Sequence, residues 1–244
     1  MKVTFVIPTY NEAENLPQIT GALFNLPIPE LYVLVVDDNS PDGTGKIAEE
    51  LGRVYSGRVQ VLHRTGKLGL GSAYIAGFQH CLRDGADAIG QMDADFSHPP
   101  EKIHHLLEVL EDYDVAMGSR YIPGGSLDVN WPLWRKSLST FGNFYARTIL
   151  GMPMHDVTGG FRLWRRQTLV NMPLERIKSN GYVFQVEMAY VAHKLGFTFR
   201  EVPIYFADRL WGSSKMSLRI QVEAAFRVWQ LLGMYSDLRK QVTS

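Results

Sequence analysis

Short apolar runs alternate with segments of helical periodicity along the first half of the chain, and this alternation limits the fold more than any other feature. The apolar runs cover Val3–Thr9, Leu31–Val36, Val59–Arg64, Ala88–Met92 and Val115–Gly118. Helices are expected between them, near Glu12–Asn25, Gly43–Tyr55, Gly69–Leu82 and Pro99–Glu111. Strands that alternate with helices form a mostly parallel sheet covered on both faces, so the sequence predicts an α/β fold.

The alternation is less regular in the second half. An aromatic and basic region runs from Trp131 to Arg166, and strand-like runs at Arg162–Arg165 and Val202–Phe206 flank a helix expected around Phe184–Leu195. A chain of 244 residues that is 45% hydrophobic can bury a large core. We therefore expect one domain with a C-terminal extension.

Polar and acidic residues follow four of the predicted strands at the point where each strand ends. These segments are Pro8–Glu12, Asp37–Ser40, Asp93–Asp95 and Ser119–Tyr121. Ligands of open α/β sheets bind outside the carboxyl ends of the strands. The sequence therefore predicts a polar ligand site on one rim of the sheet.

The segment Asp93-Ala94-Asp95 suggests a metal site within that rim. If the two carboxylates stand at the end of a strand, they point to the same side, because strand side chains alternate with period two. They could then share one hard cation such as Mg²⁺, which prefers one or two carboxylates together with phosphate oxygens. This favours a nucleoside diphosphate as ligand. A solvated acidic turn is the alternative, since two aspartates at this spacing are common.

Two further loops allow a structural and a functional interpretation. Asp37 and Asp38 follow a strand and can accept hydrogen bonds from a base or ribose, while Ser40 or Asp42 can cap the next helix. The glycine-rich segment 66–73 is similar to a phosphate-cradling loop but lacks the P-loop spacing. A flexible turn capped by a helix N-terminus explains it equally well.

Charge is balanced overall and concentrated locally. The 25 basic residues equal the 25 acidic ones, which gives no electrostatic case for nucleic-acid binding. Between Trp131 and Arg166, six basic residues face a single acidic one, Asp156; the six are Arg135, Lys136, Arg147, Arg162, Arg165 and Arg166. Guanidinium groups match phosphate oxygens, so this region predicts a phosphate site, with a solvated basic face or a patch for anionic lipid headgroups as alternatives.

The C-terminal segment Met216–Tyr235 is mostly apolar but carries a narrow stripe of Arg219, Glu223 and Arg227. Packing on the main domain and an interfacial helix with Phe226, Trp229 and Leu232 in the bilayer are both consistent with this pattern. No apolar run reaches the roughly 18 to 20 residues of a membrane span. Cys81 is the only cysteine, which excludes an internal disulfide.

Five motifs together resemble the family-two glycosyltransferases of the glycosyltransferase A-type fold. They are Ile7–Glu12, Val36–Ser40, Lys67–Gly71, Met92–Asp95 and Gly118–Tyr121. A narrower resemblance is to the polyprenol-phosphate (dolichol-phosphate) mannose synthases. It rests on Ser119-Arg120-Tyr121 with Gly124-Gly125, on Trp131-Pro132 with Arg135 and Ser139, on Thr158–Arg162, and on Arg209 with Gly212, Ser214 and Lys215.

The resemblance implies a Rossmann-like, mostly parallel sheet flanked by helices. It implies a catalytic domain over residues 1–215, with a nucleotide-sugar half at about 1–120 and an acceptor half at about 121–215. Residues 216–244 are expected to form a C-terminal amphipathic helix, either packed on the main domain or lying at the membrane interface.

The resemblance also implies the roles of individual residues. Asp95, Arg120 and Arg135 would be catalytic, Asp95 with Asp93 and Ser97 would hold Mg²⁺ or Mn²⁺, and Arg120, Arg135 and Ser139 would bind the acceptor phosphate. Ser97 stands where some relatives carry a Gln ligand. The donor would contact Pro8, Tyr10, Glu12, Val36, Asp37, Asp93, Ala94, Asp95, Arg120, Arg209 and Lys215, the last two from a loop that closes on the donor phosphates.

The implied reaction is transfer of mannose from GDP-mannose to a polyprenyl or dolichyl monophosphate, with inversion in a single displacement. The acceptor phosphate is largely dianionic at neutral pH and needs no strong base. We expect Asp156 to order the acceptor loop, with a role as base as the alternative, and the histidines to be structural. UDP-glucose or another nucleotide sugar as donor, and a non-catalytic nucleotide-sugar-binding subunit, are rival interpretations.

The same resemblance implies where the protein works. We expect a peripheral protein at the cytosolic membrane face, of the plasma membrane in a prokaryote or of the endoplasmic reticulum in a eukaryote. The membrane surface and small membrane-anchoring subunits are then its expected partners.

Overall fold

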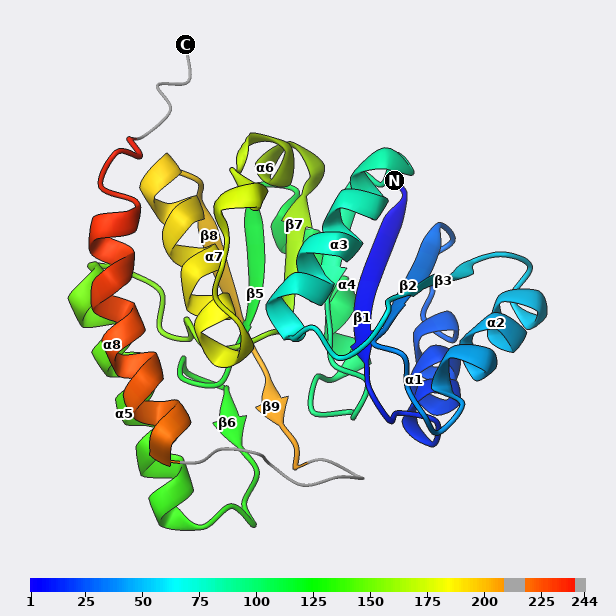
Figure 1. Ribbon diagram of the computed structural model, residues 1–244, viewed down its shortest axis with the longest axis horizontal. Helices are drawn as coiled ribbons and strands as arrows, with labels where there is room; N and C mark the ends of the chain where they lie inside the picture. The colour runs from blue at the N-terminus through cyan, green and yellow to red at the C-terminus, as the bar shows by residue number, and fades with distance from the viewer. Residues whose placement is uncertain (209–217, 240–244) are drawn as a thin grey trace.

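The computed structural model of the protein describes residues 1–208 and 218–239, without the side chains of 218–223. Its centre is a seven-stranded sheet in the order β3-β2-β1-β4-β7-β5-β8 (Figure 1). The strands are β1 (Val3–Thr9), β2 (Leu31–Asp37), β3 (Val59–His63), β4 (Ala88–Gln91), β5 (Val115–Ser119), β7 (Arg162–Arg165) and β8 (Phe199–Pro203). Only β7 runs antiparallel to its neighbours in this sheet, between β4 and β5.

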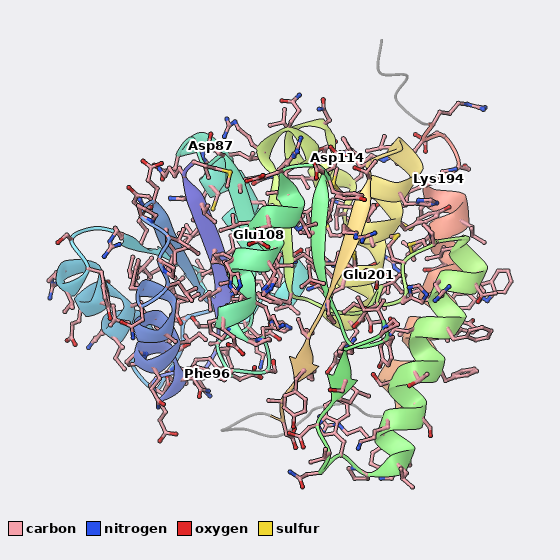
Figure 2. All side chains as sticks on the ribbon, turned by 180° about the vertical axis from the view of Figure 1, so that it is seen from behind. Asp87, Phe96, Glu108, Asp114, Lys194 and Glu201 are labelled. Carbon is pink, nitrogen blue, oxygen red and sulfur yellow. The ribbon has the colours of Figure 1, made fainter. Side chains whose placement is uncertain are left out.

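Helices cover both faces of the sheet, as an α/β fold requires. α1 (Asn15–Phe24), α2 (Thr44–Val54) and α4 (Ile103–Leu110) pack on one face, and α3 (Leu70–Arg83), α6 (Arg166–Asn171) and α7 (Gly181–Leu195) on the other (Figures 1 and 2). Single 3₁₀ turns, η1 (Pro100–Lys102) and η2 (Leu174–Arg176), precede α4 and α7. Two hydrophobic cores result, one on each face of the strands.

Two helices lie side by side beyond the β8 end of the sheet (Figure 1). They are α5 (Leu133–Leu150) and α8 (Leu218–Met234). The Tyr145 hydroxyl on α5 donates to the carbonyl of Ala225 at 3.2 Å and accepts from the indole N–H of Trp229 at 2.9 Å. The buried side chains Val228, Leu231 and Tyr235 join α8 and the residues after it to the core under α7. No helix in the described ranges has the length and apolarity to cross a bilayer.

A short parallel ribbon stands apart from the main sheet. β6 (Ser126–Leu127) pairs with β9 (Tyr205–Phe206), and Figure 1 shows the ribbon below the ends of β5 and β8. The predicted single strand at Val202–Phe206 is therefore wrong. The chain leaves the main sheet after Pro203, and Ile204 hydrogen-bonds to Ser119 and Ser126 between the two strands.

The predicted alternation of the first half is confirmed to within a few residues at each end, as are β7 and α7. The sequence pattern did not predict the 18-residue helix α5. Its inward face carries polar side chains such as Ser139 and Asn143, while its outward face carries exposed Phe141 and Phe144. This is the reverse of the usual helical pattern. The expected boundary between residues 215 and 216 lies outside the described residues.

The parallel strands bring the loops after β1, β2, β4 and β5 to one edge. Figure 2 shows Asp87 and Asp114, which precede β4 and β5, at one end of the sheet. Phe96, in the loop after β4, lies at the opposite end. The polar segments that follow these strands in the sequence therefore share the carboxyl edge, as predicted.

Candidate active site

The loop after β2 is ordered by the carboxylate of Asp37. This side chain is 3% exposed and accepts hydrogen bonds from the Thr9 hydroxyl at 3.1 Å and from the Ser40 amide and hydroxyl at 3.1 and 2.5 Å. Asp42 accepts from the amide and hydroxyl of Thr44, the first residue of α2. The N-cap of α2 is Gly43, and Asp42, one residue earlier, supports the first turn through Thr44, while Ser40 holds the Asp37 carboxylate.

Asp38, also expected on the ligand, makes structural contacts with the loop before α3. Its carboxylate forms a buried ion pair with Arg64 at 3.0 Å and accepts the amide N–H of Leu68 at 3.2 Å. These contacts hold the loop before α3 against the end of β2. They bring the Lys67 ammonium to 3.9 Å from the centre of the Tyr10 ring.

The glycines of the segment 66–73 serve close packing. A Cβ atom on Gly71 would lie 2.2 Å from the carbonyl oxygen of Ser179. At Gly69, where φ is +100°, a Cβ atom would meet the Asn180 amide oxygen at 2.8 Å. The start of α3 is thus pressed against the loop before α7, which favours the turn-and-cap interpretation over a phosphate cradle.

Asp93 and Asp95 stand in a loop, because β4 ends at Gln91. The prediction that strand alternation places the two carboxylates is therefore wrong. Hydrogen bonds place Asp95, whose Oδ1 accepts the amide of Ser97 at 3.1 Å and its hydroxyl at 2.6 Å. Asp95 and Ser97 are 5% and 1% exposed. The contacts of Ser97 in the structure thus orient the Asp95 carboxylate.

His98 fixes the other end of this loop. Its Nδ1 accepts the amide N–H of Asp93 at 3.0 Å, and its ring stacks on Phe161 with 5.3 Å between centroids. Burial lowers the pKa of His98, so the ring is neutral at pH 7 and carries its proton on Nε2. The expected structural role fits this arrangement, although nothing in the sequence indicated that His98 would line the site.

Arg120, directly after β5, is locked to Asp156. Its Nε and Nη2 donate to the two carboxylate oxygens at 2.7 Å each, its backbone amide donates at 3.0 Å, and the Gly159 amide adds a further bond at 3.0 Å. Burial raises the pKa of Asp156, but the charge and hydrogen bonds of Arg120 outweigh burial and lower it. A fully buried carboxylate with four donors and a lowered pKa is unsuited to act as a base.

The loop that carries Asp156 is itself anchored to β8. Glu201, labelled in Figure 2, accepts the amides of His155 and Asp156 at 3.0 and 2.9 Å. Thr158 accepts from Arg120 Nη2 at 2.9 Å and from the Asn143 amide of α5 at 2.8 Å. Sequence reasoning missed the contributions of Glu201 and Asn143, because both act through residues distant in the chain.

α5 supplies the remaining polar groups. The Ser139 hydroxyl lies 2.6 Å from that of Tyr121, the residue after Arg120. Arg135, one turn earlier, pairs with Asp208 at 3.4 Å and lies over the ring of Trp131. The predicted acceptor-phosphate residues Arg120, Arg135 and Ser139 are therefore brought together from two elements.

The fold divides the basic cluster inferred from composition, and three of its six members take no part in a phosphate site. Arg162 is fully buried and donates to the carbonyls of Gln185 and Val157, and burial lowers its pKa to about 10. Arg165 and Arg166 lie at the opposite edge of the sheet, because β7 is antiparallel, and donate there to main-chain carbonyls. Of the six basic residues, only Arg135 lines the cavity described next.

A cavity of about 610 Å³ joins the carboxyl edge of the sheet to the helices α5, α7 and α8. Its polar end is lined by Asp93, His98, Arg120, Arg135 and Ser139, and its other end by Tyr145, Ala146, Val183, Val186, Ala224 and Val228. The cavity therefore offers cationic groups at one end and apolar groups at the other.

The other predicted residues take different positions. Pro8, Tyr10, Glu12, Val36, Asp37, Ala94, Asp95 and Ser97 belong to the same edge but do not line this cavity. Arg209 and Lys215 lie outside the described residues. Of the predicted donor residues within the described ranges, Asp93 and Arg120 line this cavity.

The donor set around Asp95 fits a hard divalent cation. No group of three or more His, Cys, Asp and Glu side chains able to hold a metal occurs within the described ranges. Two carboxylates and a hydroxyl are oxygen donors, and Mg²⁺ is usually held by one or two carboxylates plus substrate phosphates. The nearly buried carboxylate of Asp95 suits an ion that arrives with a diphosphate.

Comparison with known proteins gives the family. The model of glycosyl transferase family 2 matches residues 4–171. Polyprenol monophosphomannose synthase of Mycolicibacterium smegmatis is 47% identical over 237 residues, which cover 96% of this chain and 89% of that protein. Undecaprenyl-phosphate mannosyltransferase of Micrococcus luteus is 47% identical over 244 residues, which cover 99% of each.

A solved structure confirms the predicted glycosyltransferase A-type fold. Glucosyl-3-phosphoglycerate synthase from Mycobacterium tuberculosis, in complex with Mn²⁺, UDP and phosphoglyceric acid, matches with a TM-score of 0.66 at 15% identity. The match covers 99% of this chain and 80% of that one. Together with the family match and the two full-length relatives, it shows that the chain is a glycosyltransferase and belongs to glycosyl transferase family 2.

Proposed function

We propose that the protein transfers mannose from GDP-mannose to a polyprenyl or dolichyl monophosphate and forms polyprenyl phosphate mannose. The cavity of about 610 Å³ carries this proposal, because it pairs two arginines at its polar end with an apolar end between three helices. A lipid monophosphate likewise has an anionic head, which suits the arginines, and an apolar chain, which suits the apolar end. The names of the two relatives, which specify mannose and a polyprenyl phosphate, support the assignment.

The acceptor phosphate acts as its own nucleophile in this proposal. It is largely dianionic at neutral pH, and an oxygen attacks C1 of the sugar from the face opposite the departing nucleoside diphosphate. Arg120, Arg135 and Ser139 hold it there, and Asp156 keeps Arg120 in place. A single displacement of this kind inverts the configuration and gives a β-linked product.

The donor lies along the edge formed by the loops after β1, β2 and β4. In the proposal, Pro8, Tyr10, Glu12, Val36 and Asp37 surround the nucleoside, and Asp93, Ala94 and Asp95 face its ribose and diphosphate. Mg²⁺ or Mn²⁺ at Asp95, with Asp93 and Ser97 nearby, would neutralise charge on the leaving diphosphate. Arg209 and Lys215 are proposed to contact the donor phosphates.

A donor panel tests the function. Purified protein is incubated with one polyprenyl monophosphate and radiolabelled GDP-mannose, UDP-glucose or other nucleotide sugars, with and without EDTA. We expect label in the lipid extract from GDP-mannose only, lost with EDTA and restored by Mg²⁺ or Mn²⁺. Turnover of UDP-glucose alone would overturn the donor assignment, and an α-linked product would exclude single displacement. Binding of donor without turnover would favour a non-catalytic subunit.

We also propose a peripheral position at the cytosolic face of a membrane, with α5 and α8 toward the bilayer and, in some settings, small membrane-anchoring subunits as partners. On α5, Leu133, Trp134, Phe141 and Phe144 are 61–80% exposed, and on α8 Phe226 and Trp229 are 66% and 56% exposed. Exposed apolar surface of this extent is unusual for a soluble protein, and aromatic side chains favour the membrane interface. α5 has three basic residues and no acidic one, which suits an anionic leaflet.

This surface reaches the cavity, since Trp134 and Phe141 belong to both. The sequence allowed α8 either to pack on the main domain or to lie at the membrane interface, and its two faces differ in this respect. Val228 and Leu231 are buried and Leu232 packs against the core, whereas Phe226 and Trp229 are exposed. A lipid acceptor could thus enter from the bilayer without leaving an apolar environment.

We expect the double variant Leu133→Ser/Phe144→Ser to bind vesicles of phosphatidylcholine and phosphatidylglycerol about tenfold more weakly than the wild type. Neither residue lines the cavity, so transfer to a short-chain acceptor in detergent should be retained. Sedimentation with vesicles measures the binding. Val54→Ser is the matched control, because Val54 is 71% exposed on α2, away from α5 and α8. If the wild type, the double variant and Val54→Ser bind vesicles equally, the exposed side chains of α5 do not contact the membrane.

A further inference from the structure

The two arginines of the proposed acceptor site are held in different ways. Arg120 is 9% exposed and is fixed by the bidentate pair with Asp156. The Arg135 side chain is 26% exposed, and its ion pair with Asp208 is long, at 3.4 Å, with the Asp208 side chain 49% exposed. Exposed pairs of this kind contribute little to order. Another contact must fix the direction of the Arg135 guanidinium.

Trp131 supplies that contact. The guanidinium carbon of Arg135 lies 3.5 Å from the centroid of the Trp131 ring, a distance at which the planar cation rests on the indole face. Trp131 is 8% exposed and lines the polar end of the cavity. A nearly buried ring offers a fixed platform, which an exposed carboxylate cannot.

Phe206 in turn holds Trp131 and connects it to the rest of the site. Its ring meets the Trp131 ring edge to face, with 5.8 Å between centroids and 80° between planes. The same ring lies 5.0 Å from the guanidinium carbon of Arg120 and 5.7 Å from the His98 ring. One side chain therefore touches Trp131 under Arg135, the Arg120 guanidinium itself and His98, the residue that fixes the Asp93 loop.

The ribbon of β6 and β9 sets the position of these two rings. The amide of Asp128 donates to the Phe206 carbonyl at 2.9 Å, and the Asp128 carbonyl accepts the amide of Trp131 at 3.2 Å. The Asp128 carboxylate accepts the amide of Asp208 at 2.9 Å, and this bond is the main cause of its lowered pKa. Asp128 thus ties both rings to one short piece of backbone.

We propose that Trp131 is a positioning residue for Arg135 and that Phe206 joins it to the Arg120 side of the site. The inference rests on the proposed function, in which Arg135 binds the acceptor phosphate. Trp131 acts through Arg135, so its loss weakens acceptor binding and leaves donor binding unchanged. In this proposal, the ribbon of β6 and β9 orients the Arg120 and Arg135 guanidinium groups relative to each other, so that both can contact one phosphate.

Kinetics of Trp131→Leu and Trp131→Phe test the role of the ring. We expect Trp131→Leu to raise the KM for polyprenyl phosphate about tenfold, in the range of a buried cation–π contact, with the KM for GDP-mannose unchanged. Trp131→Phe keeps an aromatic face and should stay within about threefold of the wild type. Equal losses for both variants, or a rise in the donor KM alone, would overturn the proposal.

A double-mutant cycle with Arg135→Ala separates positioning from a general structural effect. If Trp131 acts through Arg135, the variant Trp131→Leu/Arg135→Ala has the same acceptor kcat/KM as Arg135→Ala alone. Losses that multiply would show that Trp131 acts independently and would overturn the proposal. Trp131→Met enters the same cycle if Trp131→Leu does not fold, as judged by thermal unfolding.

Phe24→Leu is the matched control, since Phe24 on α1 also lies under an arginine, with the Arg58 guanidinium carbon 4.4 Å from its ring centroid. It is remote from the cavity and should leave both KM values unchanged. The wild type provides the other reference. Failure of the wild type to transfer mannose would refute the proposed function, whereas transfer with multiplying losses would refute the positioning role only.

Discussion

Asp95→Ala is expected to lower mannosyl transfer about a thousandfold, the scale of losing a principal electrostatic contact to the developing charge. Asp95 is 5% exposed and is held by two hydrogen bonds from Ser97, so its carboxylate keeps a fixed direction. The expected cause is loss of the divalent ion beside the diphosphate. The measurement is initial rate against metal concentration, together with Mn²⁺ binding in the presence of GDP.

Ser97→Ala provides an intermediate case. It removes the hydroxyl that orients Asp95 but leaves the carboxylate, so we expect a loss of about tenfold to a hundredfold, as for other groups that orient a metal ligand. Asp112→Ala, at an exposed aspartate, should have no effect. An Asp95→Ala protein that keeps normal rates and normal metal dependence would contradict the metal assignment.

Asp156→Ala is expected to reduce the free energy of unfolding by about 3–5 kcal/mol, because it leaves the Arg120 guanidinium buried without its counter-charge. Transfer should fall at least a hundredfold, since Arg120 loses both of its 2.7 Å contacts with the carboxylate. Urea unfolding and transfer assays at low temperature measure the two effects. Asp237→Ala, which breaks the exposed pair with Arg176, should change stability far less.

The pH dependence distinguishes positioning from base catalysis. The pKa of Asp156 is lower in the folded than in the unfolded chain, so its stabilisation is complete above the unfolded value and is lost as pH falls through the folded value. The stability deficit of Asp156→Ala should therefore shrink below about pH 4. Asp156→Asn should keep the shape of the pH–rate profile, and added formate should not restore its activity. Rescue by formate would show that Asp156 is the base.

The sequence predicted those elements whose burial in the fold is visible as a local hydrophobic pattern. β1 and β2 are buried on both faces, so Val3–Thr9 and Leu31–Asp37 are nearly continuous apolar runs. Parallel topology then determines that the loops after them share an edge. The predicted convergence of acidic and polar segments on that edge needed no contact information.

The rest depended on contacts between distant residues. The antiparallel direction of β7 sends Arg165 and Arg166 to the far edge, and composition contains no information about strand direction. α5 presents aromatic side chains outward and polar ones inward, so its hydrophobic pattern does not mark a core-facing helix. Arg135 and Trp131 are four residues apart in the sequence, whereas Trp131 and Phe206, whose rings are in contact, are 75 residues apart.

The shape of the cavity has a consequence for which lipids the protein can distinguish. A cavity of about 610 Å³ has the size that holds a drug-sized molecule, and in the proposed function its polar end takes the acceptor phosphate. A long polyprenyl chain exceeds that space, so most of its isoprene units remain in the bilayer. In the proposed function, the first unit or two would touch Val183, Val186 and Val228, which line the apolar end of the cavity, and the distant end would remain in the lipid. Saturation next to the phosphate should therefore matter for turnover, and total chain length should not.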